Sequence, residues 1–206
     1  MLIVLFVACQ RTPRFEPDPV GPPLERELGS FSKPVQWYVD TTHSSLLFRT
    51  RHTAVHDVVG WVQSYRIAVT AQRYDFSDAQ IDGRFDMRTL TMPNPEMADN
   101  VMSINFVHSD SFPQAWYRSR KIKYTGINTF EVEGDLTLKG RTHPVKLNAQ
   151  FNGFANLGHT LPGFTIEGRF SRFDFGISQR DTLKPGAAPM VDDTIYITGN
   201  FRLYHE

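Results

Sequence analysis

The stretch TFEVEGDLTLKGRTHPVKLNAQF, residues 129–151, decides the fold because its apolar residues recur at every second position. One face of its first strand carries Phe130, Val132, Gly134, Leu136 and Leu138, and the other carries Thr129, Glu131, Glu133, Asp135 and Thr137. A period of two is typical of a β-strand with one buried face. Lys139-Gly140-Arg141 then supplies a turn, and the alternation resumes from Val145 to Phe151. The stretch therefore predicts a β-hairpin.

The same alternation extends along the chain in both directions. We expect further strands at 36–39, 45–51, 58–70, 79–87, 116–124, 164–171 and 194–203. About eight antiparallel strands with one apolar face, and almost no helix to cover it, must close into a barrel or stack as two sheets. Gly134, Gly168 and Gly199 fall on the apolar face, and we interpret them as bends or as room in a lumen. We predict an all-β fold, a single closed antiparallel barrel that is lipocalin-like; a filled two-sheet sandwich is the alternative.

One segment breaks the alternation. Pro93 and Pro95 precede Glu96-Met97-Ala98-Asp99-Asn100-Val101-Met102, whose polar start and composition are typical of a short helix. We expect a short helix or lid near 95–106 that caps one opening of the barrel.

Length and charge limit the possible functions. The chain has 206 residues, enough for one domain with a core and a tail. Its 22 basic and 22 acidic residues cancel, so no long-range field attracts the phosphates of a nucleic acid. No apolar run approaches the roughly 18 residues that a membrane-spanning helix needs. We predict no nucleic-acid partner, and the sequence leaves the oligomeric state open.

The N-terminus has the pattern of a bacterial lipoprotein signal. Cys9, the single cysteine, follows the apolar run Met1-Leu2-Ile3-Val4-Leu5-Phe6-Val7-Ala8, although this run lacks the positively charged start of a secretory signal. Prolines are dense from residue 10 to residue 35 and favour an extended tether. We predict a lipobox-like signal at 1–9 with lipid attachment at Cys9, a Pro-rich tether at 10–35 and a barrel domain at 36–206. An incidental cysteine is the alternative.

Few residues point to catalysis or to a metal. His52 and His56 could share a metal only if a turn lies between them, because on one strand they would be about 13 Å apart. No cysteine pair, HExxH motif or carboxylate cluster joins them. Nucleophile elbows, phosphate loops and dinucleotide fingerprints are likewise missing from the sequence. We predict no metal, no cofactor and no enzymatic activity.

Three ordered motifs between Trp37 and Leu203 resemble the YceI-like family. WYVDTTHSSLLF (37–48) is similar to the family's opening, VEGDLTLKGRTHPV (132–145) is the most specific match, and RFDFGI (172–177) resembles an Arg-x-Asp-Phe-Gly motif. Residues 102–113 depart from the family pattern, so we expect a divergent lid. The resemblance implies a lipocalin-shaped barrel of the bacterial periplasm or outer envelope that binds a polyisoprenoid.

The alternation and the family's inward face together predict the residues of the lumen. The expected ligand-binding residues are Phe48, Ile81, Phe85, Tyr117, Val132, Leu136, Leu147, Phe151, Phe164, Ile166, Phe170, Ile195 and Ile197. His43 is expected to be structural or to face the polar end of the ligand. Arg172 and Asp174 are expected to pair on one strand face as a buried bridge at one end of the barrel.

These features favour a binding protein. We predict non-catalytic binding, carriage or sensing of a long apolar ligand, an isoprenoid or similar lipid, by a protein held at the membrane through its N-terminal lipid anchor. A lipid-modifying enzyme that uses the barrel as a reaction chamber is one alternative. A ligand-free envelope scaffold is another.

Overall fold

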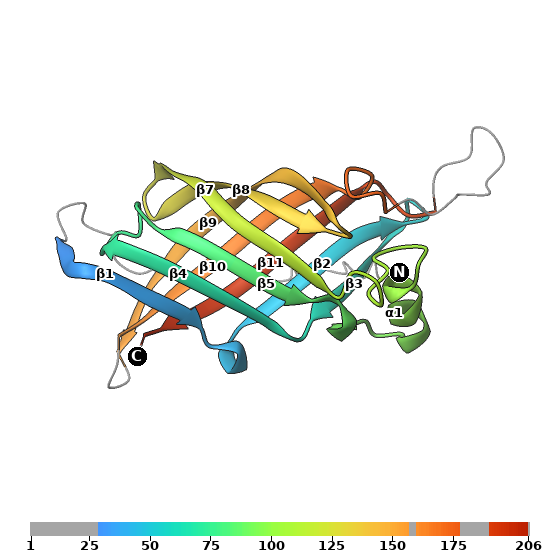
Figure 1. Cartoon of the computed structure of the whole chain (residues 1–206), viewed down its shortest axis with the longest axis horizontal. Helices are drawn as coiled ribbons and strands as arrows, with labels where there is room; N and C mark the ends of the chain where they lie inside the picture. The colour runs from blue at the N-terminus through green and yellow to red at the C-terminus, as the bar shows by residue number, and fades with distance from the viewer. Residues whose placement is uncertain (1–28, 157–159, 178–189, 206) are drawn as a thin grey trace, which may run out of the picture.

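The computed structural model describes residues 29–156, 160–177 and 190–205 (Figure 1). The predicted signal segment with Cys9, and the tether up to residue 28, lie outside these residues and stay predictions. Within the described part, the strands form one continuous sheet, and one α-helix, α1 (Pro95–Met102), lies near one end. The helix predicted near 95–106 is present and ends at Met102. None of the described helices is long and apolar enough to span a membrane.

Three of the long strands are interrupted. β1 (Ser30–Val39) continues as β2 (Ser45–His52), β3 (His56–Val62) as β4 (Tyr65–Arg73), and β5 (Gln80–Asp86) as the short β6 (Leu90–Thr91). The other strands are unbroken: β7 (Gln114–Gly126), β8 (Thr129–Leu138), β9 (Arg141–Asn156), β10 (Thr160–Ser171) and β11 (Thr194–Tyr204). With each interrupted strand counted once, the described residues form eight long strands.

The sheet closes on itself. Each long strand pairs antiparallel with the next one along the chain, and β11 returns to the first. Residues 196–200 of β11 pair with β2, and residues 203–204 pair with β1. The result is an up-and-down barrel, the architecture that removes exposed sheet edges. The predicted closed antiparallel barrel is confirmed, and the sandwich alternative is wrong.

The barrel begins earlier than the sequence indicates. β1 starts at Ser30, so the first strand extends six residues into the segment 10–35 that the sequence predicts as tether. Pro34 lies in a bulge, where β1 advances from Ser30 to Val35 while its partner moves only from Arg73 to Ala71. A proline fits a bulge because its nitrogen is not needed in the hydrogen-bond ladder.

Side-chain caps produce the interruptions of the strands. Asp40 and Asp86 each begin a 3-10 turn in which the carboxylate accepts the N–H of the second residue after it, at 3.0 Å in both turns. Between them, Ser64 donates its N–H to Thr89 Oγ1 at 2.9 Å and accepts the Asp86 N–H at 2.9 Å. Such bonds replace part of the ladder locally. The strand predicted at 58–70 is therefore divided after Val62, and the three breaks lie at one level of the barrel wall.

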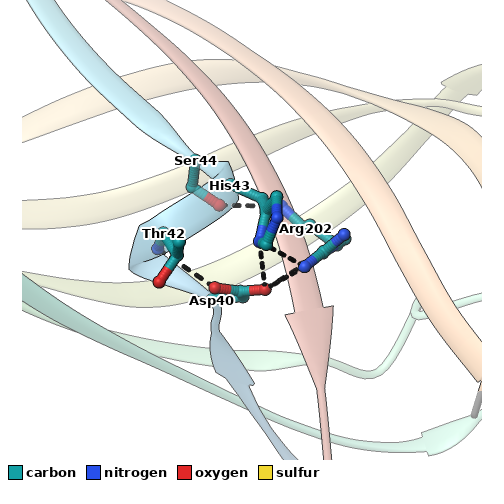
Figure 2. A network of polar contacts seen from close by, with 5 residues as sticks. All are labelled: Asp40, Thr42, His43, Ser44 and Arg202. Atoms are coloured by element: carbon teal, nitrogen blue, oxygen red, sulfur yellow. Dashed lines mark hydrogen bonds and ion pairs between the residues drawn. The ribbon is translucent and has the colours of Figure 1, made fainter.

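A polar cluster stabilises the place where β11 changes its partner (Figure 2). Arg202 Nε donates to Asp40 Oδ2 at 3.1 Å, and the Asp40 N–H donates to Arg202 O at 2.9 Å. The Arg202 N–H donates to Ser44 Oγ at 3.0 Å. The hydrogen bond from the Arg202 side chain is the main cause that lowers the pKa of Asp40 from 3.8 to about 2. The cluster joins β1, β2 and β11 at the closure of the barrel.

Asp40→Asn should lower the free energy of unfolding by about 1–2 kcal/mol at pH 7, because it removes a charged acceptor from a partly buried cluster. The folded-state pKa of Asp40 lies below the unfolded value, so this stabilisation is present above pH 3.8 and is lost as the pH falls through 2. Urea unfolding of both proteins at several pH values measures the difference.

The matched control is Asp82→Asn, which removes a similar pair with Arg118 (2.8 Å) on the exposed surface. Exposed pairs contribute little to stability, so this change should have a small effect. A loss at Asp40 no larger than the loss at Asp82, or one that persists unchanged at the lowest pH, would contradict the role of the cluster.

Candidate functional site

The inward faces of all eight long strands enclose a cavity of about 200 Å³, called the inner cavity here. Strand β8 shows how the alternation builds it, since Phe130, Val132, Leu136 and Leu138 all line it. Among the described residues, Tyr117 is the only lining residue whose side chain has an oxygen or nitrogen atom. Its hydroxyl donates to Val132 O at 3.2 Å, and burial raises its pKa. The inner cavity therefore presents an apolar surface.

Most of the predicted lumen residues lie on this surface. Those that line the inner cavity are Phe48, Ile81, Phe85, Tyr117, Val132, Leu136, Leu147, Phe164, Ile166, Phe170 and Ile197. Their contact with a ligand stays a prediction. Ile195 faces a second cavity instead.

Phe151 does not line either cavity. It is buried in an aromatic cluster, where its ring centroid lies 5.3 Å from that of Phe164 and 4.9 Å from that of Phe154. The alternation correctly gives the face on which a side chain lies. It does not give the position of the side chain along the barrel axis. Phe151 lies at the height of the aromatic cluster, where other rings surround it.

Several lining residues are missing from the predicted set. Ile67 and Val69 alternate within a predicted strand, so the period of two could have identified them. Ala79 alternates with Ile81 and Phe85 at the start of the strand predicted at 79–87, so the same period could have identified it. Phe76 lies in the connection from β4 to β5, where no periodicity exists to indicate that its side chain points inward.

A second cavity of about 230 Å³, the outer cavity, lies beneath the lid. Helix α1 supplies Met97, Asn100 and Val101, and the segment after it supplies Phe106 and Val107. The barrel wall contributes further apolar residues and the polar side chains of Thr50, His52 and Arg172. The outer cavity thus differs from the inner cavity because it offers hydrogen-bonding groups.

The two cavities adjoin each other. Both are lined by Phe48, Val62, Met87, Leu138, Phe170 and Ile197. A layer of shared side chains therefore separates them, and a chain-like molecule that passed this layer would occupy both. The two cavities therefore follow one another from the lid into the apolar interior, with this layer between them.

The glycines of the inward face do not leave room for a ligand. A Cβ at Gly134 would lie 2.5 Å from Tyr117 Cζ, and a Cβ at Gly60 would lie 2.3 Å from Phe48 Cζ. Gly168 and Gly199 are covered in the same way by Leu147 and Phe201. At each of these glycines, a larger side chain occupies the space that a Cβ would need. The interpretation of Gly134 as open lumen is wrong, because the Tyr117 ring occupies that space.

Lys139 fastens the lid to the barrel. Its Nζ donates to Phe106 O at 2.6 Å and Ile104 O at 3.3 Å, both after α1, and to Gly176 O at 3.4 Å, after β10. Burial, and then the charge of Arg141, lowers the pKa of Lys139. The turn after β8 and the turn after β10, which carry two of the sequence motifs, therefore meet at the lid.

Arg172 is buried at the same end and holds the backbone. Its Nε donates to Asp192 O at 3.0 Å, its Nη1 to Ile177 O at 2.9 Å and its Nη2 to Val191 O at 3.0 Å. β10 ends one residue before Arg172 and the chain turns, so Asp174 is exposed while Arg172 is 1% exposed. The predicted buried bridge between Arg172 and Asp174 is wrong because the strand does not continue.

His43 belongs to the closure cluster and not to either cavity. Its Nδ1 lies 2.9 Å from Asp40 Oδ2 and also contacts Arg202 (Figure 2). One ring nitrogen can donate to Asp40 or accept from Arg202, but it cannot do both. The structure thus places His43 in the structural role, at a cluster that lines neither cavity.

His52 and His56 face each other across the β2–β3 hairpin, with ring centroids 5.2 Å apart. The turn between them brings together two rings that a single strand would separate. Within the described ranges, no group of three or more His, Cys, Asp or Glu side chains could hold a metal ion. His52 also lines the outer cavity.

The sequence profile of the YceI-like domain matches residues 37–203, which is nearly the whole barrel. The chain belongs to the YceI-like domain family. A UPF0312 protein of Vibrio cholerae serotype O1 is 26% identical over 167 residues, which cover 79% of this chain and 86% of the relative.

Solved structures share the fold of this YceI-like barrel. BcnA of Burkholderia cenocepacia matches with a TM-score of 0.68 at 19% identity, covering 80% of this chain and 98% of BcnA. A polyisoprenoid binding domain from Saccharophagus degradans matches with a TM-score of 0.58 at 10% identity, covering 84% of this chain and 99% of that domain. These likenesses show the fold.

Lys139→Met keeps the length of the side chain but removes the donor for three carbonyls. The free energy of unfolding should fall by about 1–3 kcal/mol, because hydrogen bonds from a charged group are lost. Amide hydrogen exchange in residues 101–109 should become faster, because the lid loses its attachment. Hydrogen-exchange mass spectrometry and urea unfolding measure the two effects.

Lys123→Met, at an exposed position of β7, is the control and should change neither quantity. Lid amides that exchange equally fast in the wild type and in Lys139→Met would show that Lys139 does not hold the lid.

Proposed function

We propose that this protein binds a long apolar molecule, an isoprenoid or a similar lipid, inside the barrel and carries or senses it without changing it. The inner cavity is the observation that carries the proposal. Every long strand contributes apolar side chains to it, and the hydroxyl of Tyr117 is already hydrogen-bonded.

The physical chemistry of such a cavity favours an apolar occupant. An apolar cavity of about 150 Å³ stays dry and takes up benzene, and the inner cavity has about 200 Å³. Burial of apolar surface contributes about 25 cal/mol per Å². Binding energy in this cavity therefore comes from hydrophobic burial and packing.

The family supports the same proposal. The Saccharophagus degradans structure is described as a polyisoprenoid binding domain, and this chain shares its fold. An isoprenoid is therefore the first apolar ligand to test. A cavity that offers few groups for chemistry supports carriage or sensing.

The two alternatives have less support. A reaction chamber needs a group that can transfer a proton or attack the substrate, and among the described residues the inner cavity offers only Tyr117, whose pKa burial raises. A ligand-free scaffold needs a filled lumen, whereas two cavities lie inside this barrel.

We further propose that the protein works at the bacterial cell envelope, held there by a lipid on Cys9. This part rests on the sequence, namely the apolar run before Cys9 and the Pro-rich segment after it. β1 begins at the end of the barrel opposite to α1 (Figure 1). A tether that leads into β1 would therefore join the barrel away from the lid.

The natively purified protein should contain an apolar molecule that mass spectrometry of an organic extract can identify. Added isoprenoid alcohols should raise the melting temperature, because they bind only the folded state. Affinity should rise by up to about 0.8 kcal/mol per CH₂ until the chain fills both cavities. The ligand should be recovered unchanged after prolonged incubation. A melting temperature that ignores all isoprenoids would support the scaffold, and an altered ligand would support the enzyme.

Ile197→Trp provides the sharper variant of this experiment, because Ile197 lines both cavities. The larger ring should weaken the binding of long chains by about 1–3 kcal/mol through overpacking and spare short ones. Thr198→Trp places the same ring at the next position of β11, on the outward face, and should leave the profile unchanged. Identical chain-length profiles for the two variants would place the ligand elsewhere.

The anchor has its own prediction. In a bacterium that expresses the full-length gene, the wild type should partition into the detergent phase and Cys9→Ser into the aqueous phase. The difference should be large, because acyl chains contribute about 0.8 kcal/mol per buried CH₂. Equal partitioning of the two proteins would overturn the anchor and leave the barrel's binding function untouched.

A further inference from the structure

We propose that the lid end of the barrel inserts into the surface of a zwitterionic lipid bilayer, where the protein loads or unloads its ligand. The inserting residues are Val55, Ile104, Phe173 and Met190, called the lid rim here. The inference rests on the proposed function and deepens it, because it names the bilayer as the partner of the lid end. This contact is separate from a lipid on Cys9.

Four separate turns expose an apolar side chain at the lid end. Val55 is 79% exposed in the turn between β2 and β3, and Ile104 is 67% exposed in the segment after α1. Phe173, which is 49% exposed, follows β10, and Met190, which is 41% exposed, precedes β11. The β2–β3 turn and α1 lie at the same end of the barrel (Figure 1). Burial in an apolar phase would stabilise each of these side chains.

Backbone contacts place Val55 and Met190 beside each other. Thr53, in the turn that carries Val55, donates its N–H to Met190 O at 2.7 Å. His52, at the end of β2, forms a bridge with Val191. The β2–β3 turn is thus attached to the segment that precedes β11, and the two apolar side chains form one part of the rim.

Phe173 and Ile104 continue the same arc. Arg172 Nη2 donates to Val191 O at 3.0 Å, and its guanidinium carbon lies 4.3 Å from the centroid of the Phe173 ring. Lys139 Nζ donates to a carbonyl in the turn after Phe173 at 3.4 Å and to Ile104 O at 3.3 Å. The lid rim is therefore one continuous stretch of surface, unlike the single exposed apolar residues that are normal on a soluble protein.

Met190 connects the lid rim to the outer cavity, because its side chain is exposed and also lines that cavity. Apolar residues are exposed at the opposite end of the barrel too, namely Ile127, Phe154 and Tyr204. None of these three lines either cavity. The lid end is therefore the end at which exposed apolar surface is continuous with a cavity.

A long apolar ligand favours a bilayer as the occupant of the lid rim. Passage of an isoprenoid through water exposes each of its CH₂ groups, which is unfavourable in proportion to the exposed area. A lid rim that lies in the bilayer lets the chain reach the outer cavity without this exposure. A second copy or another protein would cover the same side chains but would not supply the ligand.

The charges beside the lid rim favour a zwitterionic surface. The cations there do not outnumber the carboxylates: Lys139, Arg141 and Arg172 lie close to Asp174, Asp192 and Asp193. Attraction to anionic lipids needs an excess of basic side chains. Insertion of the lid rim therefore depends on apolar contact and not on the charge of the lipids.

The test attaches the fluorophore NBD to Ile104→Cys and, as the matched control, to Ile127→Cys, each in the full chain with Cys9→Ser. Ile104 and Ile127 are 67% and 71% exposed, at opposite ends of the barrel. With phosphatidylcholine vesicles, emission at 104 should shift to the blue and be quenched by doxyl groups inside the bilayer. Emission at 127 should not change. Added phosphatidylglycerol should not strengthen the response at 104.

A transfer experiment measures the consequence for loading. Ile104→Ser should slow the transfer of a fluorescent isoprenoid from vesicles to the protein by about 3- to 10-fold, because the rim loses apolar contact with the bilayer. Ile127→Ser should leave the rate unchanged. Equal rates for the two variants would contradict the proposal.

The outcomes separate this inference from the proposed function. If isoprenoids raise the melting temperature but the label at 104 does not respond, or both labels respond equally, the inference alone is overturned. Emission at 104 that is blue-shifted without vesicles and depends on protein concentration would assign the lid rim to a second copy, which also overturns it. If the label at 104 inserts but no isoprenoid raises the melting temperature, the proposed function fails and the bilayer contact stands.

Discussion

An apolar sheet face that no second layer covers has to be buried against itself, and the main features of this barrel depend on that constraint. The strands close into a ring because α1 is too short to cover the sheet. β11 completes the ring by pairing with β2 and then with β1, and the Asp40–Arg202 cluster lies where it changes partner. Closure also directs every second side chain of each strand toward the barrel axis, and these side chains form the apolar interior.

The period of two explains why so much could be predicted from the sequence. Alternation determines on which face of the sheet a side chain lies. Residues such as Val132 and Leu136 could therefore be identified as inward-facing from the sequence alone. The alternation contains no information on the level along the axis, and Phe151 therefore proved to lie in the aromatic cluster. Nor does it show which neighbour covers a glycine, since the contact of Tyr117 with Gly134 depends on the pairing of β7 with β8. The alternation also does not show where a strand ends. Arg172 and Asp174 illustrate this, because β10 ends before Arg172 and the predicted pair does not form.

The charged residues at the lid end bind the protein's own backbone. Lys139 donates to carbonyls in the segment after α1 and in the turn after β10, and Arg172 donates to the carbonyls of Ile177 and Val191. Their hydrogen bonds stabilise the loops that surround the outer cavity. Lys139 and Arg172, charged residues of two of the sequence motifs, therefore have a structural role at the lid end.

The interrupted strands divide the barrel wall into a broken half and an unbroken half. The breaks after Val39, Val62 and Asp86 lie side by side in three neighbouring strands, whereas β7 to β11 cross the same level without interruption. Across the breaks, side-chain bonds such as Ser64 N–H to Thr89 Oγ1 replace the regular ladder. On the lid side of these breaks, β2, β3 and β6 are therefore joined to the unbroken half of the wall through the pairing of β2 with residues 196–200 of β11.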